Sequence, residues 1–356
     1  MLPLIIVILL VLFVAQQLSL VNALKGVDYE CTPSKLMVAP GEKFRLKAKL
    51  TNRRRRFISF VQVASMLPAD IQVHDPDANV MAASRCIRHT SSTFMMPRRK
   101  LSYNIPVSLP RRGRYVFHNA EVSVGDFLGF KEPKMSVRLD KEVVVYPADT
   151  SGDRVSSMLG GFLGNISVRR FIMEDPTLVV GFREYTGREP MKTISWSKTA
   201  QTRQMMVKTF DYTTEPTVSV ILNVKLSEDF KFQDRIKLLE SCYEITHTVC
   251  RTLEEHGIKY DFITNATMYG PIDNFPYVSE GLGASHFQGI LEGLGKATYS
   301  GFESFESLID RAKRKQYKGR SSVVITPGGE QEAYALLREW DRNCTLVISS
   351  QSEVAL

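Results

Sequence analysis

Apolar and polar residues alternate with a period of two through the first half of the chain. The pattern is clearest at residues 44–50, 57–63, 102–109, 113–124 and 136–145. Turn-forming pairs such as Pro40-Gly41 and Arg112-Gly113 separate these segments. Strict alternation predicts antiparallel strands with one buried and one solvated face. We therefore expect residues 27–147 to form two packed sheets, as in an immunoglobulin-like β-sandwich.

The second half has a different pattern. Residues 218–224 are a continuous apolar run, typical of a strand buried on both faces. In residues 235–256 apolar positions recur at intervals of three and four, which predicts a helix with one apolar face. Further strands and helices are expected to alternate at 258–264, 285–294, 302–315, 322–325, 330–340 and 345–348. This order predicts a doubly wound α/β sheet over residues 213–356.

The amino terminus carries an apolar run at residues 2–15, followed by a mildly polar stretch up to Leu24. A membrane helix needs about 20 apolar residues, so residues 2–24 are long enough to contact a lipid bilayer as one span. Because Lys25 and later cations follow the run and none precedes it, the bulk of the chain is expected in the cytoplasm. A cleaved signal peptide ending near Ala23 is the alternative.

These patterns define the expected fold class, an α+β multidomain protein with a single-pass anchor in the cell membrane. A Gly- and Ser-rich linker joins the two halves, and a strongly charged segment follows it. The expected divisions are a membrane helix (1–24), a basic β-sandwich (27–147), the linker (148–182), the charged segment (183–212) and an α/β domain (213–356).

Charge and cysteine content refine this picture. The net charge of +8 is uneven, because residues 25–147 hold 22 Lys and Arg against 11 Asp and Glu. Four consecutive arginines, Arg53, Arg54, Arg55 and Arg56, fall at a predicted turn. They form either a solvated loop or a surface for anionic lipid headgroups. Because no nucleic-acid-binding motif accompanies them, nucleic acid is not expected as a partner.

The five cysteines form no CxxC pair, which favours buried free thiols over two disulfides and a spare thiol.

Ionic and apolar side chains are interleaved in residues 183–210, which indicates a hydrogen-bonded scaffold rather than an ordinary core segment. The run resembles the signature of the domain of unknown function 58 family. The matching positions are Arg183-Glu184-Tyr185, Glu189, Lys192, Ile194, Trp196, Ala200 and Val207-Lys208. Two departures are that the turn glycine comes one place early, at Gly187, and that Gln201 replaces the family's arginine. The flanks, including Arg112-Gly113-Arg114-Tyr115 and Val145-Tyr146-Pro147, are also similar, so the resemblance covers nearly everything after residue 24.

The resemblance implies a von Willebrand A-like second half and a MoxR-type AAA+ ATPase as partner. In such domains Asp and Ser side chains at the strand ends hold a divalent cation. The corresponding positions here are Asn223, Lys225, Ser227 and Pro327, which offer no carboxylate, so we expect neither a metal nor a cofactor. Lys225 would replace the positive charge of the ion. At the same crevice we expect Lys225, Ser227, Ser285 and Thr326 to gather, with Ser285 as a helix N-cap.

The charged segment has a structural interpretation as a brace between the two domains. Arg183, Glu184, Glu189 and Lys192 would form an ionic network, Tyr185 and Trp196 would pack the joint, and Lys208 would lead into the sheet. With no histidine or nucleophile nearby in sequence, a catalytic role is not expected. The sequence thus favours a membrane-anchored interaction or scaffold protein, which could also contact other membrane-complex proteins. The alternatives are a hydrolase using Glu184 or Glu189 and an extracytoplasmic adhesin-like module.

Overall fold

The structure is a computed structural model of the 356-residue chain. It describes residues 24–351, with gaps at 76–78, 84–85, 126–132, 151–152, 171–178, 211–216, 227–231, 271–275, 316–320, 339 and 341–344. The chain divides into two compact units. Unit 1 comprises Met1–Ala148 with Leu294–Lys296, and unit 2 comprises Asp149–Gly293 with Ala297–Leu356.

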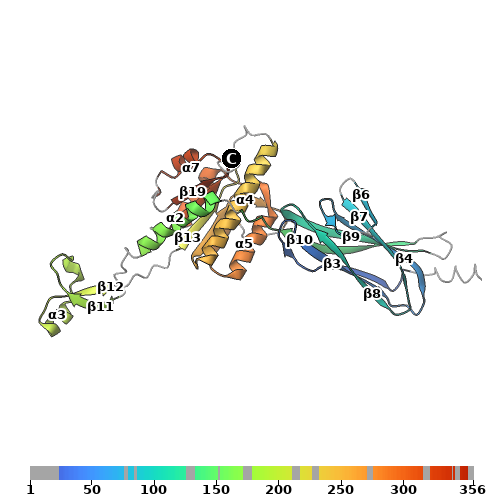
Figure 1. The fold of residues 1–356 in the computed structure, drawn as a ribbon, viewed down its shortest axis with the longest axis horizontal. Coiled ribbons are helices and arrows are strands. Elements are labelled where there is room, and N and C mark those ends of the chain that lie inside the picture. Colours follow the sequence, from blue (N-terminus) through green and yellow to red (C-terminus); the bar gives the residue numbers. More distant parts are fainter. Residues whose placement is uncertain are drawn as a thin grey trace, which may run out of the picture. The chain divides into compact units, whose positions relative to one another are not determined.

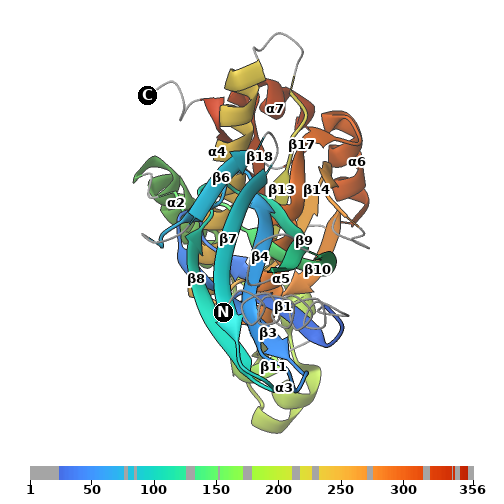
Figure 2. The same cartoon turned by 90° about the vertical axis from the view of Figure 1, so that its right-hand side faces the viewer.

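Unit 1 is built from two sheets (Figures 1 and 2). The four-stranded sheet has the order β1 (Val27–Pro33), β3 (Lys43–Asn52), β8 (Lys100–Ser108), β5 (Gln72–Val73). The six-stranded sheet has the order β2 (Met37–Val38), β10 (Lys134–Val145), β9 (Gly113–Gly125), β4 (Ile58–Pro68), β7 (Cys86–Met95), β6 (Asn79–Ala83). Apart from the parallel pair β10 and β2, neighbouring strands are antiparallel.

The core of unit 1 lies between these sheets. In β3, buried and exposed residues alternate from Lys43 to Leu50, so one face of the strand is apolar and the other carries Lys and Arg. The buried face contributes Leu46 and Leu50, which belong to one cluster with Val63 of β4 and Val122 of β9. Burial of both inner faces in one apolar cluster holds the sheets together.

Unit 2 contains a five-stranded sheet ordered β16 (Tyr277–Gly281), β14 (Lys259–Thr264), β13 (Thr217–Leu222), β18 (Ser321–Thr326), β19 (Thr345–Ser349). Four of the strands are parallel, and β16 is antiparallel to β14. Since the chain passes from β13 to a neighbour on one side and later returns to β18 on the other, the sheet has a switch point between β13 and β18.

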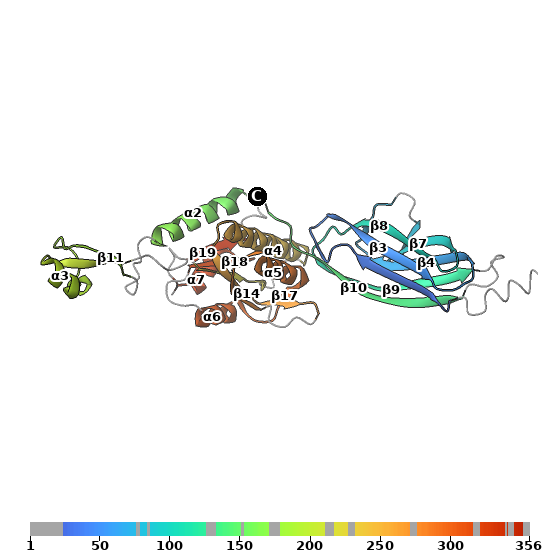
Figure 3. The same ribbon diagram turned by 90° about the horizontal axis from the view of Figure 1, so that it is seen from below.

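Helices cover both faces of this sheet (Figure 3). Helices α6 (Phe305–Lys315) and α7 (Glu330–Leu336) pack on the face that presents Ile221, Ile263 and Val324. Helix α4 (Phe232–Glu255) contacts β13, β14 and β18 from the other face. Unit 2 also contains α2 (Asp153–Arg170), α5 (Ala284–Lys296, which ends in unit 1) and the two-stranded sheet of β15 (Ala266–Met268) and β17 (Ala297–Gly301).

The expected fold class requires correction. Among the described residues, those in strands outnumber those in helices, 48% against 28%, so this part of the chain is mostly β. None of the helices in the described part of the chain is both long and apolar enough to cross a lipid bilayer. Of the span expected at residues 2–24, residues 2–23 lie outside the described residues, and the last residue, Leu24, packs against the sandwich core. The membrane helix, and with it the single-pass cell-membrane location, is therefore not retained.

Candidate functional site

Residues 179–210 form a small lobe, here called the signature lobe. Its strands β11 (Val179–Glu184) and β12 (Met206–Phe210) are antiparallel, and the connection holds a 3-10 helix, η1 (Met191–Thr193), and α3 (Trp196–Thr202) (Figure 1). The Met206 N–H donates to the Thr199 hydroxyl at 3.0 Å, and the Ser195 N–H donates to the Met206 carbonyl at 2.8 Å. These two bonds fasten α3 to the start of β12.

Glu189 organises the turn that follows β11. Its carboxylate accepts hydrogen bonds from the Thr186 N–H at 3.1 Å and the Thr186 hydroxyl at 2.8 Å, and it pairs with Arg183 at 2.5 Å. Burial works to raise the pKa of Glu189, but hydrogen bonds, led by that from the Thr186 hydroxyl, lower it to about 2. Gly187 within the turn has φ +88°, a left-handed conformation that favours glycine. The turn glycine therefore stands where the backbone requires it.

The remaining residues of the expected network lie at the surface of the signature lobe. Glu184 and Lys192 are exposed, and neither has an ion-pair partner among the described residues. Tyr185 is half-buried and its N–H donates to the Met205 carbonyl at 2.8 Å, while Lys208 is half-buried in β12. The Trp196 side chain, which was expected to pack a joint, is 63% exposed.

Apolar exposure is a general property of the signature lobe. Only Ile194 and Val207 are buried among its apolar residues, and they face each other in a β-bridge. The large apolar side chains that are 39–69% exposed are those of Val179, Val180, Phe182, Met191, Trp196 and Met205. More of the large apolar side chains of the lobe are therefore exposed than buried.

The second candidate site lies at the switch point of the unit 2 sheet, just after β13, β14 and β18. Asn223, Asn265 and Thr326 are each at most 2% exposed and are bonded together. The Asn223 side-chain oxygen accepts from the Lys225 N–H and from the Asn265 side-chain amide, both at 2.9 Å. Its amide nitrogen donates to the Lys225 carbonyl at 3.1 Å and to the Thr326 hydroxyl at 3.2 Å. Asn223 therefore makes all four hydrogen bonds that an asparagine side chain can make.

The positions corresponding to a cation site are distributed as follows. Asn223 is closed within this network, Lys225 is exposed beside it, and Pro327 is buried after β18. Ser227 lies outside the described residues. In the described part of the chain, His, Cys, Asp and Glu side chains nowhere gather in a group of three that could hold a metal ion. The donor set at this edge consists of amides, a hydroxyl and backbone groups, which fits a structural role better than a hard cation.

Two participants in this edge were not identified from sequence. Asn265 also accepts from the Val224 N–H at 2.9 Å and donates to the Glu303 carbonyl at 3.2 Å. Arg311 of α6 donates to the Thr264 carbonyl at 2.7 Å and pairs with the Glu303 carboxylate. The usable signal for Asn265 was its place directly after a buried strand; Arg311 gave none, because its partners depend on how α6 packs.

Ser285 does not join this edge. Because β16 is antiparallel and its last residue pairs with Tyr260 near the start of β14, the chain enters α5 at the opposite edge of the sheet. Ser285 lies within α5 and is exposed, so the expectation of a Ser285 N-cap was also wrong. The Gly283 N–H donates instead to the Glu254 carboxylate, at 2.9 and 3.1 Å to its two oxygens.

The arginine cluster lies in unit 1, in the turn between β3 and β4. Arg53, Arg55 and Arg56 are exposed and Arg54 is half-buried. Arg53 pairs with Asp28 at 2.5 Å. The cluster thus belongs to one end of the sandwich.

Comparisons with known proteins give little further guidance. No family model matches the chain, and no curated protein matches it. Solved structures similar to part of the chain include a type II cohesin domain from the cellulosome of Acetivibrio cellulolyticus (10% identity, 33% of this chain and 94% of that chain, TM-score 0.24). A CARDB domain from Pyrococcus furiosus in complex with di-metal ions has 8% identity over 33% of this chain and 86% of that chain, with a TM-score of 0.22. The sporulation control protein Spo0M from Bacillus subtilis has 15% identity over 45% of this chain and 58% of that chain, with a TM-score of 0.21. Likeness this weak carries no functional argument.

Proposed function

We propose that this chain is a protein-interaction protein and that the signature lobe is the surface it presents to its partner. The observation that carries the proposal is that several large apolar side chains of this one small lobe, among them Phe182, Met191 and Trp196, are exposed. Monomeric proteins rarely leave a concentrated apolar patch in water, and such patches commonly mark interaction sites. Trp in particular contributes strongly to binding energy when an interface buries it.

The charge of the signature lobe indicates the character of its partner. Residues 179–210 contain six Lys and Arg and two Asp and Glu. Lys198 lies over the Phe182 ring at 5.6 Å from its centroid, so cations border the apolar surface. A partner with an apolar centre and an acidic rim would complement this arrangement. The AAA+ ATPase of the MoxR type, implied by the family resemblance, is the partner we propose to test first.

The chemistry of Glu189 supports binding over hydrolysis. A carboxylate whose pKa is lowered to about 2 is a weak base at neutral pH. Its oxygens are already engaged by Thr186 and Arg183. Glu189 therefore suits the task of shaping the turn beneath the exposed surface.

The test is binding of the full chain to a purified MoxR-type ATPase, measured by pull-down and by titration. Trp196→Ala should weaken binding roughly 30-fold, the effect of removing an interface hot spot. Tyr269→Ala is the matched control, because Tyr269 is an aromatic residue of unit 2 that is 56% exposed outside the signature lobe. Equal binding by wild type and Trp196→Ala, or an equal loss in both variants, would contradict the proposal.

A further inference from the structure

Two turns of unit 1 are joined at one end of the sandwich by a buried asparagine. Asn52, the last residue of β3, is 1% exposed, and its side-chain amide donates to the carbonyls of Arg56 and Met96, each at 3.0 Å. Its side-chain oxygen accepts from the Arg54 N–H at 3.0 Å. The Arg98 N–H then donates to the Arg54 carbonyl at 2.8 Å. The turn between β3 and β4 is thereby locked to the turn between β7 and β8.

The amino-terminal end of the described chain joins the same structure. The Arg53 N–H donates to the Gly26 carbonyl at 2.8 Å, and Val27 is paired with Asn52. Residues 25–28, 53–57 and 94–100, here called the cationic tip, therefore form one surface. They hold one acid, Asp28, and eight cations: Lys25, Arg53, Arg54, Arg55, Arg56, Arg98, Arg99 and Lys100. The four-arginine run is thus half of a larger positive surface that only the fold assembles.

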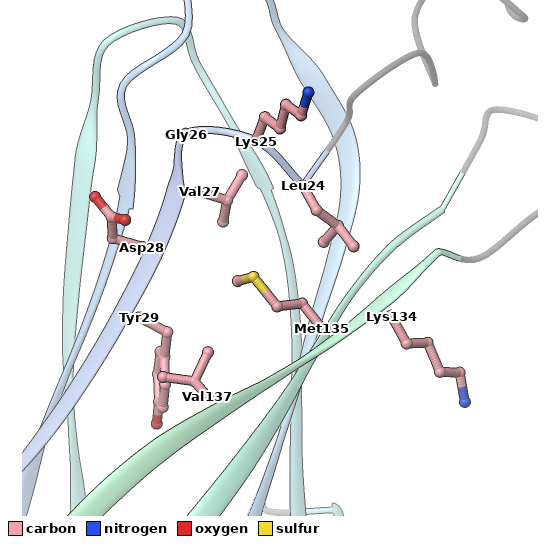
Figure 4. Close-up of a pocket in the computed structure, with 9 residues that line it drawn as sticks. All are labelled: Leu24, Lys25, Gly26, Val27, Asp28, Tyr29, Lys134, Met135 and Val137. Atoms are coloured by element: carbon pink, nitrogen blue, oxygen red, sulfur yellow. The ribbon is translucent and has the colours of Figure 1, made fainter.

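Apolar side chains accompany these cations. Phe57 and Phe94 are 42% and 59% exposed, with ring centroids 6.2 Å apart, and Met96 is 51% exposed. A pocket of about 510 Å³ lies between the starts of β1 and β10, and residues 25–28 of the cationic tip are part of its lining. Leu24, Val27 and Met135 are among its apolar lining, and the ammonium groups of Lys25 and Lys134 extend away from them (Figure 4). The cationic tip thus combines positive charge with accessible apolar surface.

We propose that the cationic tip docks on the surface of a lipid bilayer that contains anionic headgroups. Arg and Lys side chains near such a surface are attracted by the lipid phosphates. Exposed Phe and Met side chains on the same surface can enter the boundary between headgroups and acyl chains, as they do in interfacial membrane proteins. The pocket lined by Leu24, Val27 and Met135 adds further apolar surface at residues 25–28 of the cationic tip.

The same side chains favour lipid over nucleic acid. Aromatic rings can stack on bases, and cations bind either kind of phosphate. The exposed Met96 side chain and the apolar lining of the pocket, however, have no stacking role and suit an acyl environment. Charge and apolar exposure together therefore point to a bilayer, with nucleic acid as the alternative to be tested.

The experiment measures partition of the full chain onto vesicles of phosphatidylcholine alone and of equal parts phosphatidylcholine and phosphatidylglycerol. The tip variant is Arg55→Gln/Arg98→Gln/Arg99→Gln. The matched control, Lys43→Gln/Arg45→Gln/Lys47→Gln, removes equal charge from the exposed face of β3. Residues 1–23 are the same in the wild type and in both variants, so any contribution of these residues to vesicle binding cancels when the variants are compared.

Each cation near an anionic membrane surface contributes about 1 kcal/mol of binding free energy, so the loss of three should weaken partition of the tip variant onto anionic vesicles roughly 100-fold. Partition of the control variant should be nearly unchanged. Phe94→Ser, a second variant at an exposed site, should also weaken anionic-vesicle binding while keeping its salt dependence. Equal losses in tip and control variants, or no preference of the wild type for anionic vesicles, would overturn the proposal. The proposal would also be overturned if the tip variant lost binding to an oligonucleotide but kept its binding to vesicles, because that result would assign the surface to nucleic acid.

Discussion

The side-chain amide of Asn265 donates to the side-chain oxygen of Asn223 at 2.9 Å, and both residues are buried at the end of the unit 2 sheet. They follow neighbouring parallel strands, β14 and β13, so the sheet register brings together two residues 42 positions apart. A carboxylate at either position would leave donors or acceptors mismatched. The amide pair explains why this edge is closed where a metal-binding domain would present an acid.

Asn223→Asp should destabilise the protein by about 2 to 4 kcal/mol, because a buried anion would face the Lys225 carbonyl without a donor between them. The measurement is urea-induced unfolding followed by tryptophan fluorescence; Trp340 packs against the apolar core of this sheet and reports on it. Asn104→Asp, at an exposed position of β8, is the control and should change stability by less than about 0.5 kcal/mol. A similar stability for both variants would refute this account of the edge.

Magnesium or manganese should not bind at the same edge. The polar side chains there already satisfy one another, and Lys225 would repel a cation. Calorimetric titration of the full chain is the measurement. Submillimolar binding that disappears in Asn223→Ala would contradict the expectation, whereas binding that survives this substitution would place the ion elsewhere.

Glu189 should titrate with a midpoint near pH 2, followed by the carboxyl carbon resonance in NMR. Since the folded-state pKa is below the ordinary value of 4.5, the stabilising effect is fully present above that value and is lost as the pH falls toward 2. Thr186→Val removes the hydroxyl donor and should move the midpoint upward. A wild-type midpoint near pH 4.5 would mean that the turn is not closed in solution.

Many of the strands and helices could be predicted from local periodicity in the sequence. Buried residues alternate with exposed ones along strands such as β3, and apolar residues recur every three or four positions along α4. Short strands could not be found this way: β5, β15 and the hairpin of β11 and β12 hold two to six residues, too few for a period to be measured. Their omission, together with that of the longer strands β1 and β7, made the expected fold less β-rich than the described part of the chain is. The membrane helix was inferred from apolar composition alone, without the tertiary contacts that would distinguish a span from other apolar runs.

The candidate sites were partly visible in the sequence. Asn223 and Lys225 were located through the family resemblance, at the end of a predicted buried strand, and Glu189 through the resemblance of the charged segment to the family signature. Asn265 also follows a buried strand, but its role and that of Asn52 could not be inferred from that position, because their partners lie 42 and 44 residues away in the sequence and meet them only through the pairing of strands and turns. Asparagine in a strand or turn gives no sequence signal that its amide will be fully used.

Cysteine reactivity should follow burial. Cys31, Cys242 and Cys250 are buried and Cys86 is half-buried, and all four are free thiols. Burial raises the pKa of both the Cys31 and Cys250 thiols, which lowers the thiolate fraction available for reaction. Alkylation of the native protein followed by mass spectrometry should label Cys86 first among these four. Faster labelling of Cys31 than of Cys86 would mean that β1 opens readily in the native state.

Asn52→Ala should destabilise unit 1 by about 2 to 3 kcal/mol. The substitution leaves the Arg56 and Met96 carbonyls and the Arg54 N–H without their side-chain partner, and buried polar groups are costly to leave unpaired. Hydrogen exchange of the amide protons is the measurement, because it resolves the loss residue by residue. The Arg54 and Arg98 amides should lose protection first, since one bonds directly to Asn52 and the other depends on the position of Arg54. Asn104→Ala, on the exposed face of β8, is the control and should leave both amides protected. If Asn52→Ala left their exchange unchanged, the two turns would be held together by other contacts, and the cationic tip would not depend on this asparagine.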